Sequence, residues 1–271
     1  MRPGRRNPPS VLVSALFLVV AATLAGTQAR GQTTPPSRQL TVAAAADLKF
    51  AMDDLVQEFA RGHPEVAVRV TYGSSGNFFS QLSNGAPFDL FFSADVDYVR
   101  RLAADGLTVP DSDFVYAVGR IVLWAPRASA FDVSRGIGLL KDASVRRIAI
   151  ANPRHAPYGR AAEGALKTLG VYDQVHAKLV FGENVAQAAQ FVETGAADVG
   201  IIALSLAIAP TLASSGRFWE IPPESYPRME QGGVIMKGAK DILAARGFRD
   251  LVLGPAGRSV LKRYGFFVPG T

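Results

Sequence analysis

The chain of 271 residues contains no cysteine and three histidines. The absence of cysteine excludes disulfide bonds, thiolate zinc sites, iron–sulfur clusters and cysteine nucleophiles. The histidines His63, His155 and His176 are scattered and show no H-x-x-x-H spacing, which argues against an imidazole metal site. Neither a Walker loop nor a G-x-S-x-G motif occurs, so the common signatures of nucleotide-binding and serine-hydrolase enzymes are missing.

Charge is also sparse, because charged residues make up 19% of the chain and no dense run of basic residues occurs. The formal net charge is +6, and no aromatic RNA-binding motif accompanies it. These features argue against nucleic acid as a partner. Hydrophobic residues reach 48%, which is enough to build a sizeable core and excludes a largely disordered chain.

The first 29 residues have the organisation of a secretory signal peptide. Arg2, Arg5 and Arg6 precede an apolar run over residues 11–24, and Thr27-Gln28-Ala29 offers a small-residue cleavage site. The run is short for a membrane span, although an uncleaved anchor is the alternative. Cleavage after Ala29 would leave 26 basic and 23 acidic residues, a net charge of +3. We therefore expect a protein secreted to the periplasm, with residues 30–38 as a flexible lead-in.

Strand and helix patterns alternate along the rest of the chain. A small and apolar run over residues 40–46 predicts a buried strand, with Asp47 as the N-cap of the helix that follows. The same alternation continues to the C-terminus, which predicts an α/β fold with mostly parallel sheets. Two extended segments, residues 116–125 and 224–233, could carry the chain between two lobes with a cleft between them.

Four strand-to-helix junctions are unusual in composition, and they cover residues 45–48, 73–76, 156–159 and 183–186. Ligands of open α/β sheets bind beside such junctions, where free amides and the helix dipole favour anions. The alternative is that Asp47, Ser74 and Ser75 are ordinary caps or turn residues.

At these junctions the chain resembles periplasmic molybdate-binding proteins, the solute receptors of ABC importers. The resemblance covers nearly all of the mature chain, in family order, and its most specific blocks are Gly85-Ala-Pro-Phe-Asp-Leu-Phe-Phe-Ser-Ala-Asp95 and Lys262-Arg-Tyr-Gly-Phe266. The other matching segments are Leu40–Leu48, Tyr72–Gly76, Ala151–Gly159, Glu183–Val185 and Gly200–Ser205.

The resemblance implies a two-lobed periplasmic binding protein fold of type II, with parallel-rich sheets in each lobe and a ligand cleft between the lobes. Residues 39–117 and 229–271 would form lobe I, and residues 118–228 would form lobe II. The implied function is capture of molybdate or tungstate in the cleft and delivery to the membrane permease of an ABC importer. We expect a monomer that is not an enzyme and has no cofactor.

The family holds its oxyanion with hydroxyls and backbone amides rather than with Lys or Arg. Carried over by motif, the ligand-binding residues are Ala46, Asp47 and Ser75 in the first lobe and Tyr158 and Val185 in the second lobe. No bare metal cation is implied, because the metal arrives as its oxyanion.

Two positions depart from the commoner family pattern. Many members have Ser where this chain has Asp47, and many have Tyr where it has Ala203. Tyr158, in the turn Pro157-Tyr158-Gly159, is interpreted as the replacement hydroxyl. Asp47 either caps its helix, leaving its own amide and that of Leu48 to the ligand, or accepts a proton-bearing anion such as hydrogen phosphate.

The alternatives to molybdate are therefore another oxyanion, such as sulfate or phosphate, or a small organic anion on the same fold. A more distant alternative is a secreted serine hydrolase that uses Ser75. The sequence offers no His and Asp in supporting motifs for that reaction.

Overall fold

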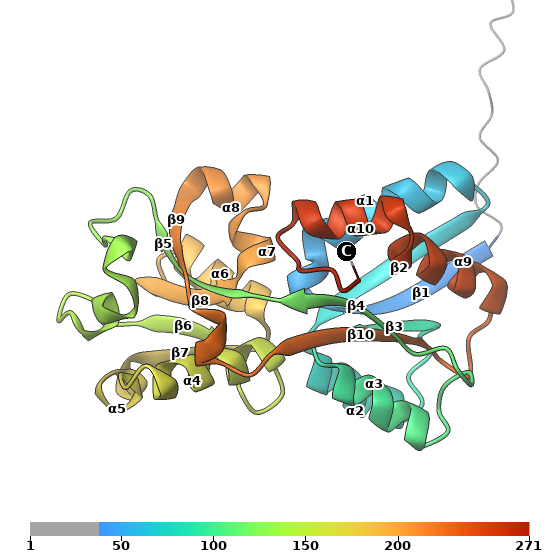
Figure 1. Ribbon diagram of the computed structural model, residues 1–271, viewed down its shortest axis with the longest axis horizontal. Helices are drawn as coiled ribbons and strands as arrows, with labels where there is room; N and C mark the ends of the chain where they lie inside the picture. Colours follow the sequence, from blue (N-terminus) through green and yellow to red (C-terminus); the bar gives the residue numbers. More distant parts are fainter. Residues whose placement is uncertain (1–37, 271) are drawn as a thin grey trace, which may run out of the picture. The chain divides into compact units, whose positions relative to one another are not determined.

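The computed structural model describes residues 38–270, which form two five-stranded sheets with helices packed on them (Figure 1). The expected signal peptide lies outside the described residues. We call each sheet with its helices a lobe: the first lobe contains the sheet that begins at Arg38, and the second lobe contains the other sheet. Among the helices of residues 38–270, none combines the length and apolar composition needed to cross a membrane.

The sheet of the first lobe takes strands from both ends of the chain. Its strand order is β2-β1-β3-β10-β4, in which β2, β1 and β3 are parallel and β10 runs antiparallel to both β3 and β4. The bounds are β1 (Arg38–Ala45), β2 (Val66–Gly73), β3 (Leu90–Ser93), β4 (Phe114–Gly119) and β10 (Met229–Ile235).

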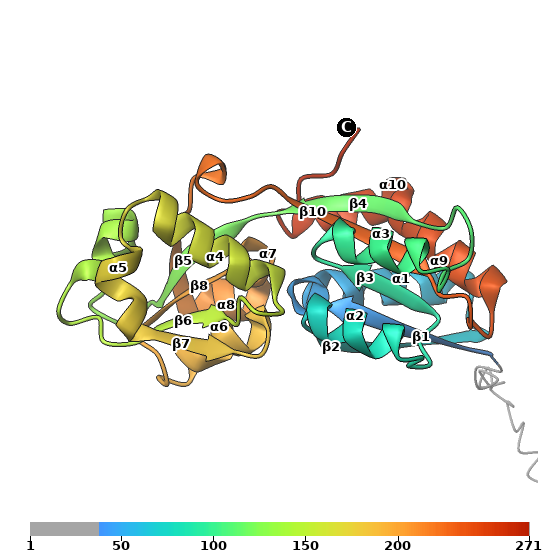
Figure 2. The same cartoon turned by 90° about the horizontal axis from the view of Figure 1, so that it is seen from below.

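Helices cover both faces of this sheet because alternate residues of each strand point to opposite sides. In Figure 1, α1, α9 and α10 lie on one side of this sheet and α2 and α3 on the other, which is the side that faces the viewer in Figure 2. Val42 and Ala44 of β1 pack in the core with α1, α9 and α10, whereas Ala43 packs with α2 and α3. Both faces are therefore buried, as the uninterrupted apolar run of β1 predicts. The bounds are α1 (Lys49–Gly62), α2 (Ser75–Ser83), α3 (Val96–Ala104), α9 (Ile242–Leu253) and α10 (Pro255–Arg263).

The sheet of the second lobe has the order β7-β6-β8-β5-β9, and it comes from one continuous segment. Its strands are β5 (Ile121–Pro126), β6 (Ile148–Ala151), β7 (Leu179–Gly182), β8 (Val199–Ala203) and β9 (Gly216–Glu220). Its helices are α4 (Pro157–Thr168), α5 (Tyr172–Val175), α6 (Val185–Glu193), α7 (Leu204–Ala207) and α8 (Pro210–Ser215). Four 3₁₀ segments complete the described chain: η1 (Ala46–Leu48), η2 (Val133–Lys141), η3 (His176–Lys178) and η4 (Pro223–Ser225).

The predicted α/β class is confirmed, but the prediction of mostly parallel sheets is wrong. Each sheet has two parallel and two antiparallel pairings. The antiparallel pairings all involve β10 or β5, strands that border the two stretches where the chain passes between the lobes. The parallel part of each sheet is made by strands joined through helices, as β–α–β connections require.

Three expected boundaries also change. The extended segment 116–125 is two strands in different sheets, separated by Arg120. The extended segment expected at residues 224–233 becomes a strand only at Met229, and this strand, β10, continues to Ile235. Arg38, placed in the flexible lead-in, is the first residue of β1, and its guanidinium pairs with Asp241 at 2.5 Å.

Candidate functional site

The four predicted strand-to-helix junctions line one narrow cavity of about 10 Å³. Pockets for drug-sized organic ligands generally occupy about 300–1,000 Å³, so the two lobes leave far too little room here for such a ligand. No Lys or Arg is among its lining residues. They are Ala45, Ala46, Asp47, Gly73, Ser74, Ser75 and Ala94 of the first lobe, and Ala156, Pro157, Tyr158, Asn184 and Val185 of the second lobe.

All five residues assigned to the site from sequence thus lie around one cavity, although their contact with a ligand stays a prediction. Ala203, where many relatives of the resembled family have Tyr, is buried at the end of β8 and does not line the cavity. The neighbouring Ser205 instead donates a hydrogen bond to the backbone oxygen of Asp47 at 2.7 Å. Ser205 therefore holds the η1 turn from the second lobe.

The cavity receives the N-terminal ends of several helical segments. Ser75 is the first residue of α2, and Val185 is the first residue of α6. The first N–H groups of a helix have no acceptor within it, and the helix dipole makes this end positive. The amide of Gly76 is already used, because it donates to the backbone oxygen of His155 at 2.9 Å. The cavity is therefore an environment for an anion although no cationic side chain lines it.

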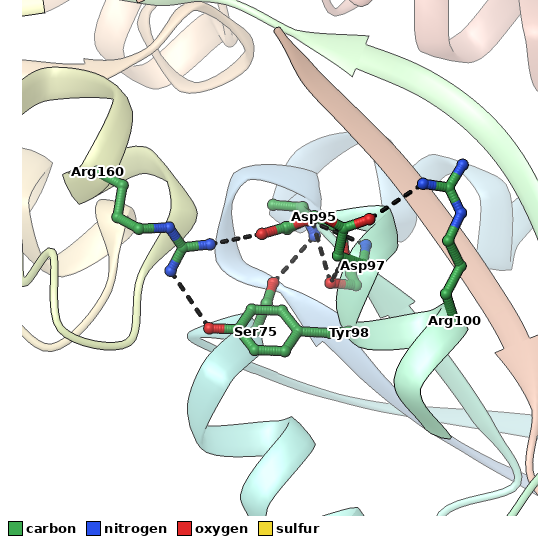
Figure 3. A network of polar contacts seen from close by, with 8 residues as sticks. Ser75, Asp95, Asp97, Tyr98, Arg100 and Arg160 are labelled. Atoms are coloured by element: carbon green, nitrogen blue, oxygen red, sulfur yellow. Dashed lines mark hydrogen bonds and ion pairs between the residues drawn. The ribbon is translucent and has the colours of Figure 1, made fainter. Parts of the chain in front are cut away.

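Ser75 has the hydrogen-bonding pattern of a donor toward the cavity. Its side chain is buried, and its Oγ accepts a hydrogen bond from the amide of Ala94 at 2.9 Å (Figure 3). A hydroxyl that accepts in this way still has its own proton to donate. Ser74 occupies the N-cap position of α2, as the capping alternative predicts, but its side chain makes no cap bond, and its Oγ contacts His155 Nδ1 at 2.9 Å.

Asp47 is not the N-cap that the sequence predicts. The η1 turn begins one residue earlier, at Ala46, so Asp47 lies within the first turn. Its buried carboxylate is directed to other elements: Oδ2 accepts hydrogen bonds from Tyr158 Oη at 2.9 Å and Gln231 Nε2 at 2.8 Å. The other carboxylate oxygen, Oδ1, is buried and has no hydrogen-bond partner.

The surroundings of Asp47 make its carboxyl easier to protonate, but they leave it mostly ionised at neutral pH. Burial raises the pKa of its carboxyl to about 6, and this effect exceeds the opposing influence of the hydrogen bonds from Gln231 and Tyr158 and of the nearby amides of Asp47 and Leu48. Burial, followed by the charge of Asp47, also raises the pKa of Tyr158 well above its ordinary value. Tyr158 is therefore a neutral hydroxyl at any physiological pH.

Gln231 is a part of the site that sequence reasoning missed. Its side chain is fully buried, and its Nε2 contacts both Asp47 and Tyr158 Oη, the latter at 3.1 Å. Tyr116 donates to its Oε1 at 2.9 Å and so fixes the orientation of the amide. No local signal identifies Gln231, because it belongs to β10 and reaches Asp47 only once β10 has paired with β3 and β4.

Gly119 allows this cluster to form. A Cβ atom at Gly119 would lie 2.5 Å from Tyr158 Oη and 2.6 Å from Gln231 Nε2, which is closer than atoms approach without displacement. The absence of a side chain at the end of β4 therefore leaves room for the Tyr158–Gln231 contact.

Val185 is positioned by the capped start of α6. The side chain of Asn184 accepts a hydrogen bond from the amide of Gln187 at 3.0 Å, which fixes the first turn of the helix. This cap bond leaves the amide of Val185 without an acceptor in the helix, at the edge of the cavity. Within residues 38–270, no group of three or more His, Asp or Glu side chains could hold a metal ion.

Comparison with known proteins assigns the whole described chain to one family. The model of the bacterial extracellular solute-binding protein family matches residues 40–267. The molybdate-binding protein ModA of Azotobacter vinelandii is 37% identical over 230 residues, which cover 84% of this chain and 89% of ModA. ModA of Escherichia coli is 31% identical over 237 residues, which cover 85% and 89%.

A solved structure agrees with the sequence comparisons. The periplasmic molybdate-binding protein of Azotobacter vinelandii superposes with a TM-score of 0.78 at 33% identity. The match covers 85% of this chain and 99% of that structure. The two-lobed fold expected from the resemblance is thereby confirmed.

Proposed function

The chain belongs to the bacterial extracellular solute-binding protein family, and we propose that it captures molybdate in the cavity formed by the four strand-to-helix junctions. It is a binding protein of an ABC transport system. Like its molybdate-binding relatives, it is not an enzyme. Molybdate is then its ligand, bound as an oxyanion, and not a cofactor.

The observation that carries this proposal is the small cavity lined by neutral donors from both lobes. In the proposed complex, the hydroxyl and amide of Ser75 and the amides of Ala46 and Asp47 bind the oxyanion from the first lobe. The hydroxyl of Tyr158 and the amide of Val185 bind it from the second lobe. Hydrogen bonds from neutral groups to a charged acceptor are strong, so a dianion needs no Lys or Arg here.

The protonation state of Asp47 distinguishes molybdate from hydrogen phosphate, the nearest alternative ligand. An ionised carboxylate beside a dianion is repulsive, whereas a protonated carboxyl is neutral and can donate. A ligand that carries its own proton, such as hydrogen phosphate, would instead donate to the unpartnered Oδ1. The raised pKa of Asp47 reduces the free-energy cost of protonating it beside a bound dianion, whose charge raises that pKa further, and this favours molybdate.

Hydrolysis by Ser75 has no support from the geometry. The Ser75 hydroxyl contacts the amide of Ala94, and the nearest histidine in this network, His155, contacts Ser74 instead. A serine nucleophile needs a base within hydrogen-bonding reach.

We extend the proposal to the delivery of molybdate. The partner is the membrane permease of an ABC importer, the receptor acts as a monomer in the periplasm, and residues 1–29 direct its export. Tungstate binds at the same site because it has the same charge and tetrahedral shape. The proposed lobe division is residues 39–117 with 229–271 and residues 118–228, except that Val118 and Gly119 complete β4 and so join the first lobe.

Calorimetric titration of the purified protein tests the function. We expect tight binding of molybdate and tungstate, weak binding of sulfate and phosphate, and a higher melting temperature with the bound anion. Phosphate or sulfate winning a direct competition would overturn the ligand assignment and leave the receptor function intact. No heat and no thermal shift with any of the four anions would overturn both.

A further inference from the structure

We propose that Arg160 is a positioning residue that holds the second lobe against the first over the bound anion, and so sets the rate of anion release. This inference rests on the proposed function, because it concerns the closed form that holds the anion. Arg160 does not line the anion cavity. It lies two residues after Tyr158 on α4 and extends across to α3 of the first lobe (Figure 3).

The contact combines an ion pair with a hydrogen bond. One terminal nitrogen of Arg160 lies 2.5 Å from Asp95 Oδ2, and the other donates to Tyr98 Oη at 3.2 Å. The guanidinium carbon also lies 5.6 Å from the centre of the Tyr98 ring, a cation–π distance. This ion pair joins α4 of the second lobe to the N-cap residue of α3 in the first lobe.

Asp95 is held in place before Arg160 reaches it. Its Oδ1 caps α3 by accepting a hydrogen bond from the amide of Asp97 at 3.0 Å, which leaves Oδ2 for the guanidinium. A carboxylate already fixed by its own helix loses little further freedom in the ion pair. The side chains of Arg160 and Asp95 remain 39% and 29% exposed, so water partly screens the attraction.

The same junction connects this ion pair to the anion cavity. The amide of Ala94, the residue before Asp95, donates to Ser75 Oγ. On the other side, α4 carries both Tyr158 and Arg160. Both partners of the ion pair are therefore within two residues of the cavity lining, and separation of the lobes breaks the pair. An interaction present only in the closed form shifts the population toward that form.

Three variants separate this role from a structural one. Asp95→Asn removes the charge but keeps the cap of α3, because Asn caps a helix as well as Asp. Arg160→Met keeps the apolar stem and removes the guanidinium. The combined variant Asp95→Asn/Arg160→Met removes both partners. The matched control is Arg100→Met, which removes the ion pair between Arg100 and Asp97 within α3.

The measurement is stopped-flow binding and release of molybdate, followed by protein fluorescence. We expect each single variant to release molybdate about 3- to 30-fold faster, with an unchanged association rate, because the ion pair forms after the anion enters. The combined variant should match the faster single variant, since the second substitution has no ion pair left to remove. Arg100→Met should release molybdate at the wild-type rate.

Wild-type release rates in all three variants would overturn the role of Arg160, and so would an equal acceleration in Arg100→Met. An effect confined to the association rate would also contradict it. These results leave the proposed function intact when the wild-type protein binds molybdate. A wild-type protein that binds none of the four anions contradicts the proposed function, and the role of Arg160 with it.

Discussion

Tyr158 and Asp47 lie in different lobes and are joined by one hydrogen bond of 2.9 Å between Tyr158 Oη and Asp47 Oδ2. A tyrosine hydroxyl has one proton, so Tyr158 cannot donate to an ionised Asp47 and to a bound anion at once. A neutral group at position 47 removes this conflict. This hydrogen bond therefore couples the protonation of Asp47 to anion binding.

The substitution Asp47→Asn should strengthen molybdate binding. The Asn oxygen can keep the hydrogen bond from Gln231 while Tyr158 turns its proton to the anion, and the amide nitrogen then occupies the place of the unpartnered Oδ1. The substitution removes a negative charge and supplies a donor, a gain of about 1.5–3 kcal/mol if that donor reaches the anion. Calorimetry at pH 8 measures it. Weaker molybdate binding, together with a selective loss of phosphate binding, would show that Asp47 accepts a proton from the ligand.

The contribution of Asp47 to the stability of the closed form should fall as the pH rises from 4 to 7. The pKa of Asp47 is about 6 in the fold, against 3.8 for an unperturbed Asp, so folding favours the protonated form. This contribution is fully present below pH 4 and is lost as the pH rises through 6. Its size is on the order of 3 kcal/mol. Urea unfolding at pH 4.5 and pH 8 should show that Asp47→Asn removes this part of the pH dependence. An equal pH dependence in both proteins would contradict it.

Ser75→Ala should weaken molybdate binding about 10- to 100-fold, because the anion loses a hydroxyl donor worth about 1.5–3 kcal/mol. The variant also leaves the amide of Ala94 unpaired, so some stability is lost. Ser112→Ala is the matched control: Ser112 is equally buried, and it donates to the backbone oxygen of Val109 at 2.7 Å, outside the cavity lining. Equal affinities in the two variants would place Ser75 outside the binding site.

Tyr158→Phe tests the hydroxyl from the second lobe. The ring stays and only the donor is lost, so we expect molybdate affinity to fall by about 1.5–3 kcal/mol. Tyr226→Phe serves as the control, because the buried Tyr226 hydroxyl contacts the amide of Ile121 and does not line the cavity. An unchanged molybdate affinity for Tyr158→Phe would show that the Tyr158 hydroxyl binds Asp47 and does not bind the anion.

Gly76→Ala should hinder closure of the lobes. A Cβ at Gly76 would lie 2.5 Å from the backbone oxygen of His155 in the second lobe and 2.9 Å from Tyr98 Oη. Displacing these groups costs about 1–3 kcal/mol of binding free energy, whereas the α2 helix itself tolerates Ala. Gly62→Ala is the control, because a Cβ there has no atom within 4 Å. Titration of both variants should show weaker binding for Gly76→Ala alone, and equal affinities would exclude a closure contact at this position.

Local sequence predicts much of the cavity lining. The residues that contribute a backbone amide or a short hydroxyl, such as Ser75 and Val185, lie where a buried strand runs into a helix, and both strand and helix leave a clear pattern. The carboxyl ends of parallel strands meet at one edge of a sheet, so the sequence pattern alone predicts that these junctions lie close together.

The polar cluster behind the lining could not be predicted in this way. Gln231 and Tyr116 belong to strands that are far along the chain from β1 and η1, and the direction of the Asp47 carboxylate depends on them. The antiparallel pairings were missed for the same reason. They depend on how the chain returns between lobes, which a window of neighbouring residues does not encode.

The strand order of the first lobe has a consequence for folding. The strand β10 lies between β3 and β4, yet it follows β4 in the chain by more than a hundred residues. The first sheet is therefore incomplete until the C-terminal part of the chain has been synthesised, whereas the strands of the second sheet are continuous and can pair earlier. Late, long-range pairing makes completion of the first sheet the slow step. During export through a membrane channel, the lobe that contributes Asp47 and Ser75 would thus stay incomplete until nearly the last residues of the chain emerge.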